Sequence, residues 1–259
     1  VEVMIDEAAS IILGDIEKAF NNGAILRTHL LRPTWHFVTP EDIRWLLKLT
    51  ASRIYALSAF MIRKMELNTK IFKRSDAVLA KTLQGGKHLT RVELNSSLLK
   101  AKINTDDLRL IYIMMHAELE GIICSGPRKG KHFTYALLDE RVPPVKAIDK
   151  EESLALLAQR YFTSRGPATL QDFVTWSGLA VKDAKAGMFS LGKNFLHEMM
   201  DGKEYIFSST VKNITHPQTT FLMPVYDEYG IGYKDRSAIF DQAIQAQQVS
   251  RGNAVFNKT

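Results

Sequence analysis

Hydrophobic and polar residues alternate with two periods along this chain, and the order of the two periods repeats. Between residues 90 and 138, apolar residues recur first at helical and then at strand spacing, which predicts two short helices and a hairpin. Thr90 and Glu93 have the spacing of a capping box at the start of the first of these helices. Another helix is predicted over residues 71–83. Helices followed by a hairpin with a basic tip are typical of a winged helix, which we place over residues 69–142.

The last helix of this unit has few polar side chains. We expect it to begin at Thr105, because Asp106 and Asp107 favour a helix N-terminus. Its predicted core stripe comprises Leu108, Ile111, Tyr112, Met115 and Leu119. The opposite face carries Leu110, Ile113, Met114 and Ala117, with Arg109 and His116 as its polar members. Since base edges are read by polar side chains, we expect this helix to pack against another domain and not to read a DNA sequence.

The same order of elements recurs over residues 143–209. Helices are predicted near residues 154–161, 169–176 and 181–191. Thr169 and Asp172 have capping-box spacing at the start of the second of these helices. Asp201-Gly202 then marks the turn of a hairpin. This segment is therefore predicted to be another winged helix.

A partial copy of the pattern lies at the start of the chain. A helix is predicted to end at Asn22-Gly23, and two β-favouring runs bracket Arg32-Pro33, which predicts a hairpin. A helix of about 25 residues should follow, since Pro40 suits a first helical position and the apolar stripe continues that far. Thr39 and Asp42 are expected to form its capping box.

We therefore predict an α+β, mostly helical fold of tandem winged-helix domains with short β-hairpin wings and a β-containing C-terminal part. The expected divisions are residues 1–68, holding the partial first domain and the long helix, then 69–142, 143–209 and an incomplete segment, 210–259. In that last segment, residues 221–225 are predicted to form a strand. Residues 226–236 combine acidic, basic and aromatic side chains, which suits a pocket wall, a nucleic-acid channel or a charged loop. We expect the chain to be part of a longer protein.

Composition narrows the class of function only moderately. The formal net charge of +6 is compatible with a polyanionic partner. No apolar run approaches the roughly 20 residues that span a bilayer, and a single cysteine indicates a reducing compartment. There is no P-loop and no dinucleotide-binding glycine pattern, so no cofactor is expected. His29 and His36 could face each other across the first hairpin, but the scattered histidines do not predict a metal site.

Exposed basic residues are the first candidates for DNA contact. Arg128, Lys129 and Lys131 lie on the turn of the wing over residues 126–131, where they can reach phosphates. Lys182 and Lys185 lie on the last helix of residues 143–209. The alternative for each group is an ordinary solvated surface.

Several segments, taken together, resemble the winged-helix DNA-binding-domain proteins of the AlkZ-like DNA glycosylase superfamily. They are LRTHLLRPTWHFVTPEDIRWLL, GGKHLTRVEL, GIICSGPRKGKHFTYALL, RYFTSRGPATLQDFVTWSGL and YDEYGIGYKDRS, in this order between residues 16 and 238. The resemblance implies tandem winged helices that form a positively charged channel, and excision of alkylated or crosslinked purines by hydrolysis of the N-glycosidic bond. It places the Arg-x-Thr-x-His pattern of Arg32, Thr34 and His36 near the active site. It also places Asp227, Lys234 and Arg236 in the same cleft.

The family's catalytic signature is a Gln-x-Gln or Gln-x-Asp motif ahead of the first hairpin, where it positions the attacking water. No such motif precedes Arg32 in this chain, and Gln245-Ala246-Gln247 lies beyond the last matching segment. We expect the motif upstream of Val1, or this branch lacks it. By chemistry, Arg32 and Lys234 would hold phosphates, and His36 would bind a phosphate or orient a neighbour; a supporting histidine inside the hairpin is the alternative.

Three functions remain open. The first is a DNA-repair glycosylase acting on damaged double-stranded DNA, the second a non-catalytic DNA-binding regulator, and the third a scaffold whose winged helices bind protein. In the first two cases we expect a monomeric, cytoplasmic bacterial protein that associates with the nucleoid and not with a membrane.

Overall fold

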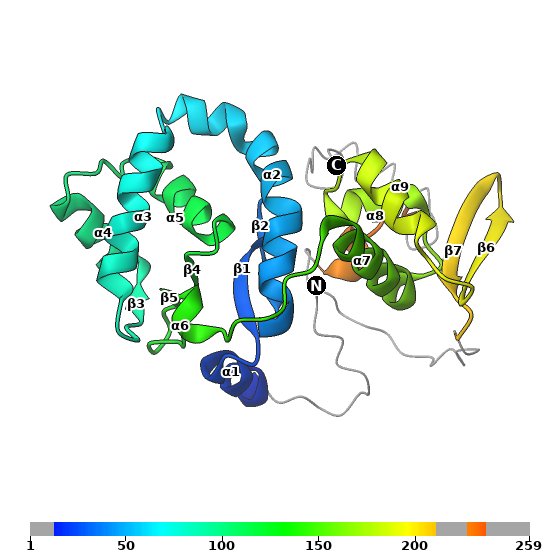
Figure 1. Cartoon of the computed structure of the whole chain (residues 1–259), viewed down its shortest axis with the longest axis horizontal. Coiled ribbons are helices and arrows are strands. Elements are labelled where there is room, and N and C mark those ends of the chain that lie inside the picture. The colour runs from blue at the N-terminus through cyan, green and yellow to red at the C-terminus, as the bar shows by residue number, and fades with distance from the viewer. Residues whose placement is uncertain (1–12, 211–226, 237–259) are drawn as a thin grey trace, which may run out of the picture. The chain divides into compact units, whose positions relative to one another are not determined.

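The computed structural model describes residues 13–210 and 227–236 (Figure 1). The chain divides into two compact units, residues 1–149 and 150–259, and each is described by itself. Both units combine helices with small antiparallel sheets, in agreement with the predicted α+β class. The predicted strand over residues 221–225 and Gln245–Gln247 lie outside the described residues. Among the described helices, none is both long and apolar enough to cross a membrane.

The first unit begins with a helix, a hairpin and a long helix, as predicted. They are α1 (Leu13–Asn22), β1 (Leu26–Leu30), β2 (Thr34–Val38) and α2 (Pro40–Lys64). Pro40 is the first residue of α2, but the expected capping box is wrong. The Thr39 side chain makes no capping hydrogen bond, and Asp42 instead accepts a hydrogen bond from the indole nitrogen of Trp45 at 2.9 Å. A side-chain hydrogen bond within the first turns of α2 thus takes the place of the predicted capping box.

The rest of this unit contains the predicted helices and wing. They are α3 (Thr69–Leu83), β3 (Leu89–Thr90), α4 (Arg91–Lys100), α5 (Arg109–Leu119), β4 (Ile123–Ser125), β5 (Thr134–Leu137) and the short α6 (Leu138–Arg141). The strands form an antiparallel sheet in the order β3-β5-β4. Thr90 and Glu93 form the predicted capping box at the start of α4. The paired prolines and charges of residues 139–146 predict a linker, but the first residues of this segment belong to α6, which continues directly from β5.

The predicted core face of α5 is partly wrong. The helix begins at Arg109 and not at Thr105, and Ile111 is exposed. Ile113, Met114 and Ala117, which were expected to face a neighbouring domain, belong to the core shared with α3 and α4. The cause is burial on several sides, since α5 contacts α2, α3, β1 and β4 within the same unit.

A polar network joins α5 to two neighbouring helices. The Tyr55 hydroxyl on α2 lies 2.6 Å from Nδ1 of His116 and 2.7 Å from Oε1 of Glu120, both at the end of α5. Nε2 of His116 lies 3.2 Å from Oδ2 of Asp76 on α3, and the Phe72 ring stacks on the imidazole at 4.0 Å. The polar side chains at this end of α5 therefore hold helices together.

The single cysteine of the sequence, Cys124, is fully buried in β4. Burial raises the pKa of its thiol to about 12. At neutral pH the thiol is therefore protonated and unreactive.

The second unit repeats the order of elements seen from α3 to β5. It contains α7 (Lys150–Arg165), α8 (Leu170–Ser177), α9 (Val181–Phe189), β6 (Phe195–Met200), β7 (Lys203–Ser208) and the short α10 (Glu228–Ile231). Thr169 and Asp172 form the predicted capping box of α8. The β6–β7 turn falls at Asp201-Gly202, both with positive φ, as predicted. Ala168 pairs with Ile206 of β7, just as β3 pairs with β5 in the first unit.

The helices of the second unit approach each other closely at Gly187. A Cβ at this position would lie 2.6 Å from the Leu154 carbonyl oxygen and 3.3 Å from Cβ of Ala158, both on α7. The absence of a side chain therefore allows α9 to pack directly against the α7 backbone.

We expect Gly187→Ala to destabilise the second unit by about 1–3 kcal/mol, because the added methyl group forces α9 away from α7. Urea unfolding followed by circular dichroism measures the change. Gly192→Ala is the matched control, since no atom lies within 4 Å of its Cβ position. Equal stability of the two variants would show that α7 and α9 are not in close contact.

Candidate nucleic-acid interface

The first hairpin is fixed to the rest of its unit by a buried contact between a histidine and a carboxylate. Nδ1 of His29 on β1 contacts Oε2 of Glu118 on α5, and both side chains are almost completely buried. The backbone N–H of Arg27 also donates to the hydroxyl of Ser125 on β4, at 2.8 Å. These two contacts set the position of β1 against α5 and β4.

One face of the hairpin carries an arginine and aromatic side chains. The strand register pairs Arg27 with Phe37 and His29 with Trp35, so these four residues share a face. The Arg27 guanidinium lies 4.4 Å from the Trp35 ring centroid and 3.8 Å from that of Phe133, the residue just before β5. Burial lowers the pKa of Arg27, although an arginine stays cationic at neutral pH.

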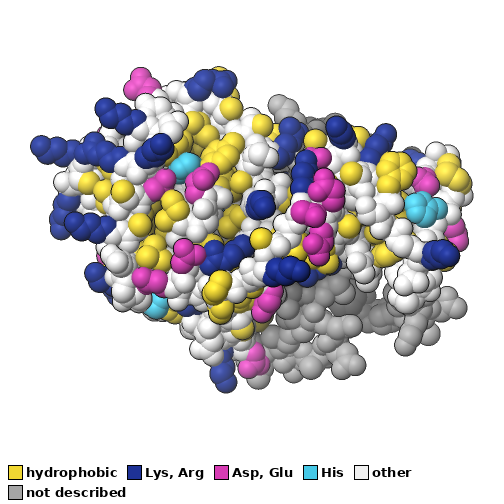
Figure 2. Space-filling model, in the orientation of Figure 1, with side chains coloured by type: hydrophobic (Ala, Val, Ile, Leu, Met, Phe, Trp, Pro, Cys, Tyr) yellow, Lys and Arg dark blue, Asp and Glu magenta, His cyan; other side chains and the backbone are white. Residues whose placement is uncertain are grey.

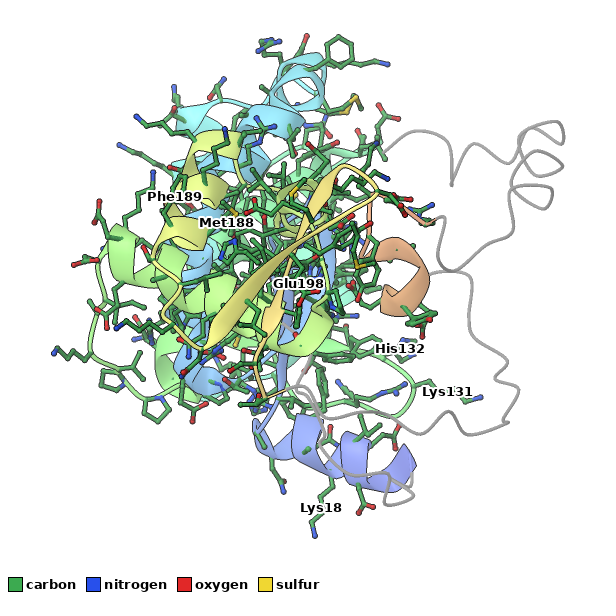
Figure 3. The ribbon with its side chains drawn as sticks, turned by 90° about the vertical axis from the view of Figure 1, so that its right-hand side faces the viewer. Lys18, Lys131, His132, Met188, Phe189 and Glu198 are labelled. Atoms are coloured by element: carbon green, nitrogen blue, oxygen red, sulfur yellow. The ribbon has the colours of Figure 1, made fainter. Side chains whose placement is uncertain are left out.

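The basic residues predicted at the wing tip differ in their availability. Arg128 donates to Glu17 of α1 at 3.0 Å and lies over the Phe133 ring, so it fastens the wing to α1. Lys129 pairs with Glu93, which also caps α4. The Lys131 side chain is exposed and makes no hydrogen bond or ion pair with the described residues, while the Lys131 carbonyl oxygen accepts from Arg128 at 3.1 Å. Figure 3 shows Lys131 and His132 at the end of the wing, close to α1.

Further basic side chains of this unit lie over α3 and α4 (Figure 2). They belong to Lys70, Lys73, Arg74, Lys81, Arg91 and Lys100. No local pattern in the sequence distinguishes these residues, because isolated lysines and arginines on helices are ordinary surface residues.

The Arg-x-Thr-x-His residues lie around the hairpin turn, away from Arg27. Arg32 is in the turn, and Thr34 and His36 are on β2, opposite Leu30 and Thr28. They therefore occupy the other face of the hairpin from Trp35 and Phe37. Because they lie on opposite faces of the hairpin, His29 and His36 do not face each other. In the described ranges, no group of His, Cys, Asp and Glu could hold a metal ion.

His36 is a neutral imidazole at physiological pH. Burial, assisted by the positive charge of Arg32, lowers its pKa to about 3. Nδ1 lies 3.1 Å from the Thr34 carbonyl oxygen, which places the ring proton on Nδ1 and leaves Nε2 as an acceptor. His36 is thus suited to accept a hydrogen bond and not to neutralise a phosphate.

The remaining predicted residues lie in the second unit. Asp227 caps α10 by accepting from the N–H of Tyr229 at 2.9 Å. The backbone N–H groups of Lys234 and Asp235 both donate to Oδ1 of Asp172, the capping residue of α8, at 2.7 and 3.1 Å. These bonds dock the charged segment on α8, and Arg236 follows it.

The ends of this segment are also held. Glu228 accepts from the indole nitrogen of Trp176 at 3.0 Å, and the Tyr233 hydroxyl donates to the Arg165 carbonyl oxygen at 3.0 Å. The predicted lysines Lys182 and Lys185 lie on α9, where both are exposed. The part of residues 226–236 from Asp227 to Arg236 is a charged loop and short helix packed on α8.

The comparisons with known proteins identify the class to which this chain belongs. The family model described as "DNA glycosylase AlkZ-like" matches residues 13–256, and the chain belongs to this AlkZ-like family, as predicted. Among solved structures, the fold is similar to that of Streptomyces sahachiroi DNA glycosylase AlkZ, with a TM-score of 0.61 and 18% sequence identity. The match covers 75% of this chain and 55% of that one, so this chain spans about half the length of AlkZ. No curated protein matches the chain.

Replacing Glu118 by Ala should lower the stability of the first unit by about 3 kcal/mol, because His29 would stay buried without its partner. Thermal unfolding measures the loss. The matched control is Glu204→Ala, which removes an exposed carboxylate 3.0 Å from His197 and should cost less than about 1 kcal/mol. A cost as small as that of the control would show that the hairpin does not depend on the His29–Glu118 contact.

The chemical shift of the His36 ring should stay constant between pH 8 and pH 5 in an NMR titration, with His36→Gln used to assign the signal. Folding disfavours the protonated imidazole, so below the unfolded pKa of about 6.5 the unfolded state binds more protons. His36 therefore reduces stability as the pH falls from about 6.5 towards 3. Titration of the ring near pH 6.5 would contradict the burial of His36.

Proposed function

We propose that this chain is a DNA-binding protein of tandem winged helices that takes part in excising alkylated or crosslinked purines from DNA. The observation that carries the proposal is the match to the AlkZ-like family model over residues 13–256. The reaction is hydrolysis of the N-glycosidic bond, and the substrate is damaged double-stranded DNA.

The order of elements supports the winged-helix part of the proposal. In the first unit, α3, α4 and α5 precede the hairpin β4–β5, and in the second unit α7, α8 and α9 precede the hairpin β6–β7. A residue just before α4 pairs with β5, and a residue just before α8 pairs with β7. Helix α5 corresponds to the helix that reads bases in helix-turn-helix proteins. Its buried surface and its contacts with α2 and α3 favour binding through phosphates, which carries affinity without sequence selectivity.

Hydrolysis of the N-glycosidic bond of an alkylated purine does not require a strong general acid. An alkylated purine is a good leaving group, and the developing oxocarbenium ion is stabilised by carboxamide or carboxylate oxygens near the sugar. In the proposal, Thr34 and the neutral His36 lie close to the reacting nucleotide, and Nε2 of His36 accepts a hydrogen bond from a neighbouring group. Arg32 binds a flanking phosphate.

The phosphate contacts of the proposal come from side chains in both units. They are Arg128, Lys129 and Lys131 of the wing, Lys182 and Lys185 of α9, and Lys234 and Arg236 of the C-terminal segment. Arg128 and Lys129 can bind a phosphate only by giving up their ion pairs with Glu17 and Glu93. Lys131 needs no such exchange among the described residues, so it is expected to contribute most within the wing.

DNA containing N7-methylguanine tests the proposal. The chain, and the protein encoded by its complete reading frame, are incubated with the modified duplex and an unmodified control. We expect free base and an alkali-labile abasic site from the modified duplex alone, and release at least tenfold slower for His36→Ala. Lys48→Ala, which removes an exposed lysine of α2, is the control variant.

The salt dependence of DNA binding distinguishes the alternatives. For each phosphate contacted, the logarithm of the affinity should fall by about 0.9 per logarithm of salt concentration. DNA binding with this slope but without base release would favour a non-catalytic DNA-binding protein. If no DNA binds, a scaffold that binds other proteins would be the better explanation.

A further inference from the structure

The Arg27 guanidinium lies between two aromatic rings and is hydrogen-bonded to no carboxylate among the described residues. It makes no hydrogen bond or ion pair with any residue that the structure describes, and its Nε is buried. Arg128 and Arg141 also have a buried Nε without a hydrogen bond, but their terminal nitrogens have partners: Arg128 donates to Glu17, and Arg141 donates to the Phe20 carbonyl oxygen at 2.8 Å. Since a partly desolvated charge without an anionic partner is unfavourable, Arg27 is suited to an anion from outside the unit.

The two rings that enclose Arg27 remain accessible on their outer sides. Trp35 is 46% exposed and Phe133 is 37% exposed, although large aromatic residues are usually buried. Both rings are also held in place. Trp35 packs on His29, which contacts Glu118, with 5.1 Å between ring centroids, and Phe133 packs edge-to-face on the buried Phe20 at 5.7 Å. Their exposure is therefore a feature of a rigid surface.

The surroundings of this surface favour an anion. Phe37, which is 45% exposed, adds a third ring, and Phe20 supports it at 6.1 Å. Lys131 and His132 lie at the end of the wing that carries Phe133 (Figure 3). Aromatic rings beside guanidinium and ammonium groups match the alternating bases and phosphates of an unpaired DNA strand.

We propose that Arg27, Trp35 and Phe133 form a site for an unpaired nucleotide of DNA. Arg27 donates hydrogen bonds to a phosphate, and a base stacks on the outer side of Trp35 or Phe133. The inference rests on the proposed DNA-binding function and adds to it that the first hairpin and the wing together hold a nucleotide that has left the double helix. This face of the hairpin is the one opposite Thr34 and His36, so the site is separate from the candidate catalytic residues.

Tryptophan fluorescence gives a direct test, because Trp35 is the exposed member of the three tryptophans in the sequence. Trp45 and Trp176 are 8% and 3% exposed and serve as an internal reference. A stacked base quenches indole emission. We expect a single-stranded oligothymidine and a duplex with a looped-out base to quench the emission, whereas heparin, which has charge and no bases, should bind without quenching.

Variants separate stacking from electrostatic attraction. Phe133→Leu and Trp35→Leu should each weaken binding of the single strand by about five- to a hundredfold in fluorescence anisotropy with labelled DNA. Phe60→Leu is the matched control, since Phe60 is an exposed aromatic residue of α2 and should leave the affinity unchanged. Arg27→Gln should lower the salt dependence by about one phosphate contact.

The possible results divide clearly. Salt-dependent DNA binding without quenching, or equal affinities for the Phe133→Leu and Phe60→Leu variants, would overturn this site and leave the proposed function standing. Quenching without any release of damaged bases would support the site and count against the glycosylase. Absence of DNA binding would overturn both, as would quenching by a protein partner in place of DNA.

Discussion

The contact between His29 and Glu118 joins the first hairpin to α5, and the geometry of the candidate interface depends on it. Among the described strands, β1 pairs with β2 alone, so the position of β1 is set by side chains and not by a larger sheet. With His29 held by α5 and the Arg27 backbone held by Ser125, the hairpin lies against β4. Arg27 and Trp35 then meet Phe133, which comes from a distant part of the sequence. A buried polar contact thus specifies how two hairpins combine.

The two units apply the same local rule twice. Thr90 caps α4 and Thr169 caps α8, and each threonine directly follows a residue that is paired with β5 or β7, respectively. This pairing fixes the start of the capped helix against the hairpin. The caps are used differently, however. Glu93 also pairs with Lys129 of the wing, whereas Asp172 also accepts the backbone N–H groups of Lys234 and Asp235. The repeated cap therefore anchors a wing in one unit and the C-terminal segment in the other.

Local signals in the sequence were sufficient for most elements but not for the site. The boxes at Thr90 and Thr169 and the turn at Asp201-Gly202 involve neighbouring residues, and they were predicted correctly. Thr39 was not, because Asp42 bonds to Trp45. The faces of α5 were misassigned because a helix that is apolar on every side has no informative period. Arg27 was missed because its role depends on Phe133, and no local pattern indicates that pairing.

The burial of Cys124 makes the opening of the interface observable. Its thiol lies in β4, beside the strand that carries Arg27 and His29, and it is protonated at neutral pH. A thiol reagent can modify it only in molecules where the packing around β4, which includes the first hairpin, has opened. Because the sequence has no other cysteine, the rate of modification reports the free energy of this local opening without further engineering. The rate at which Cys124 is modified therefore measures the local stability of the packing around β4, which includes the first hairpin.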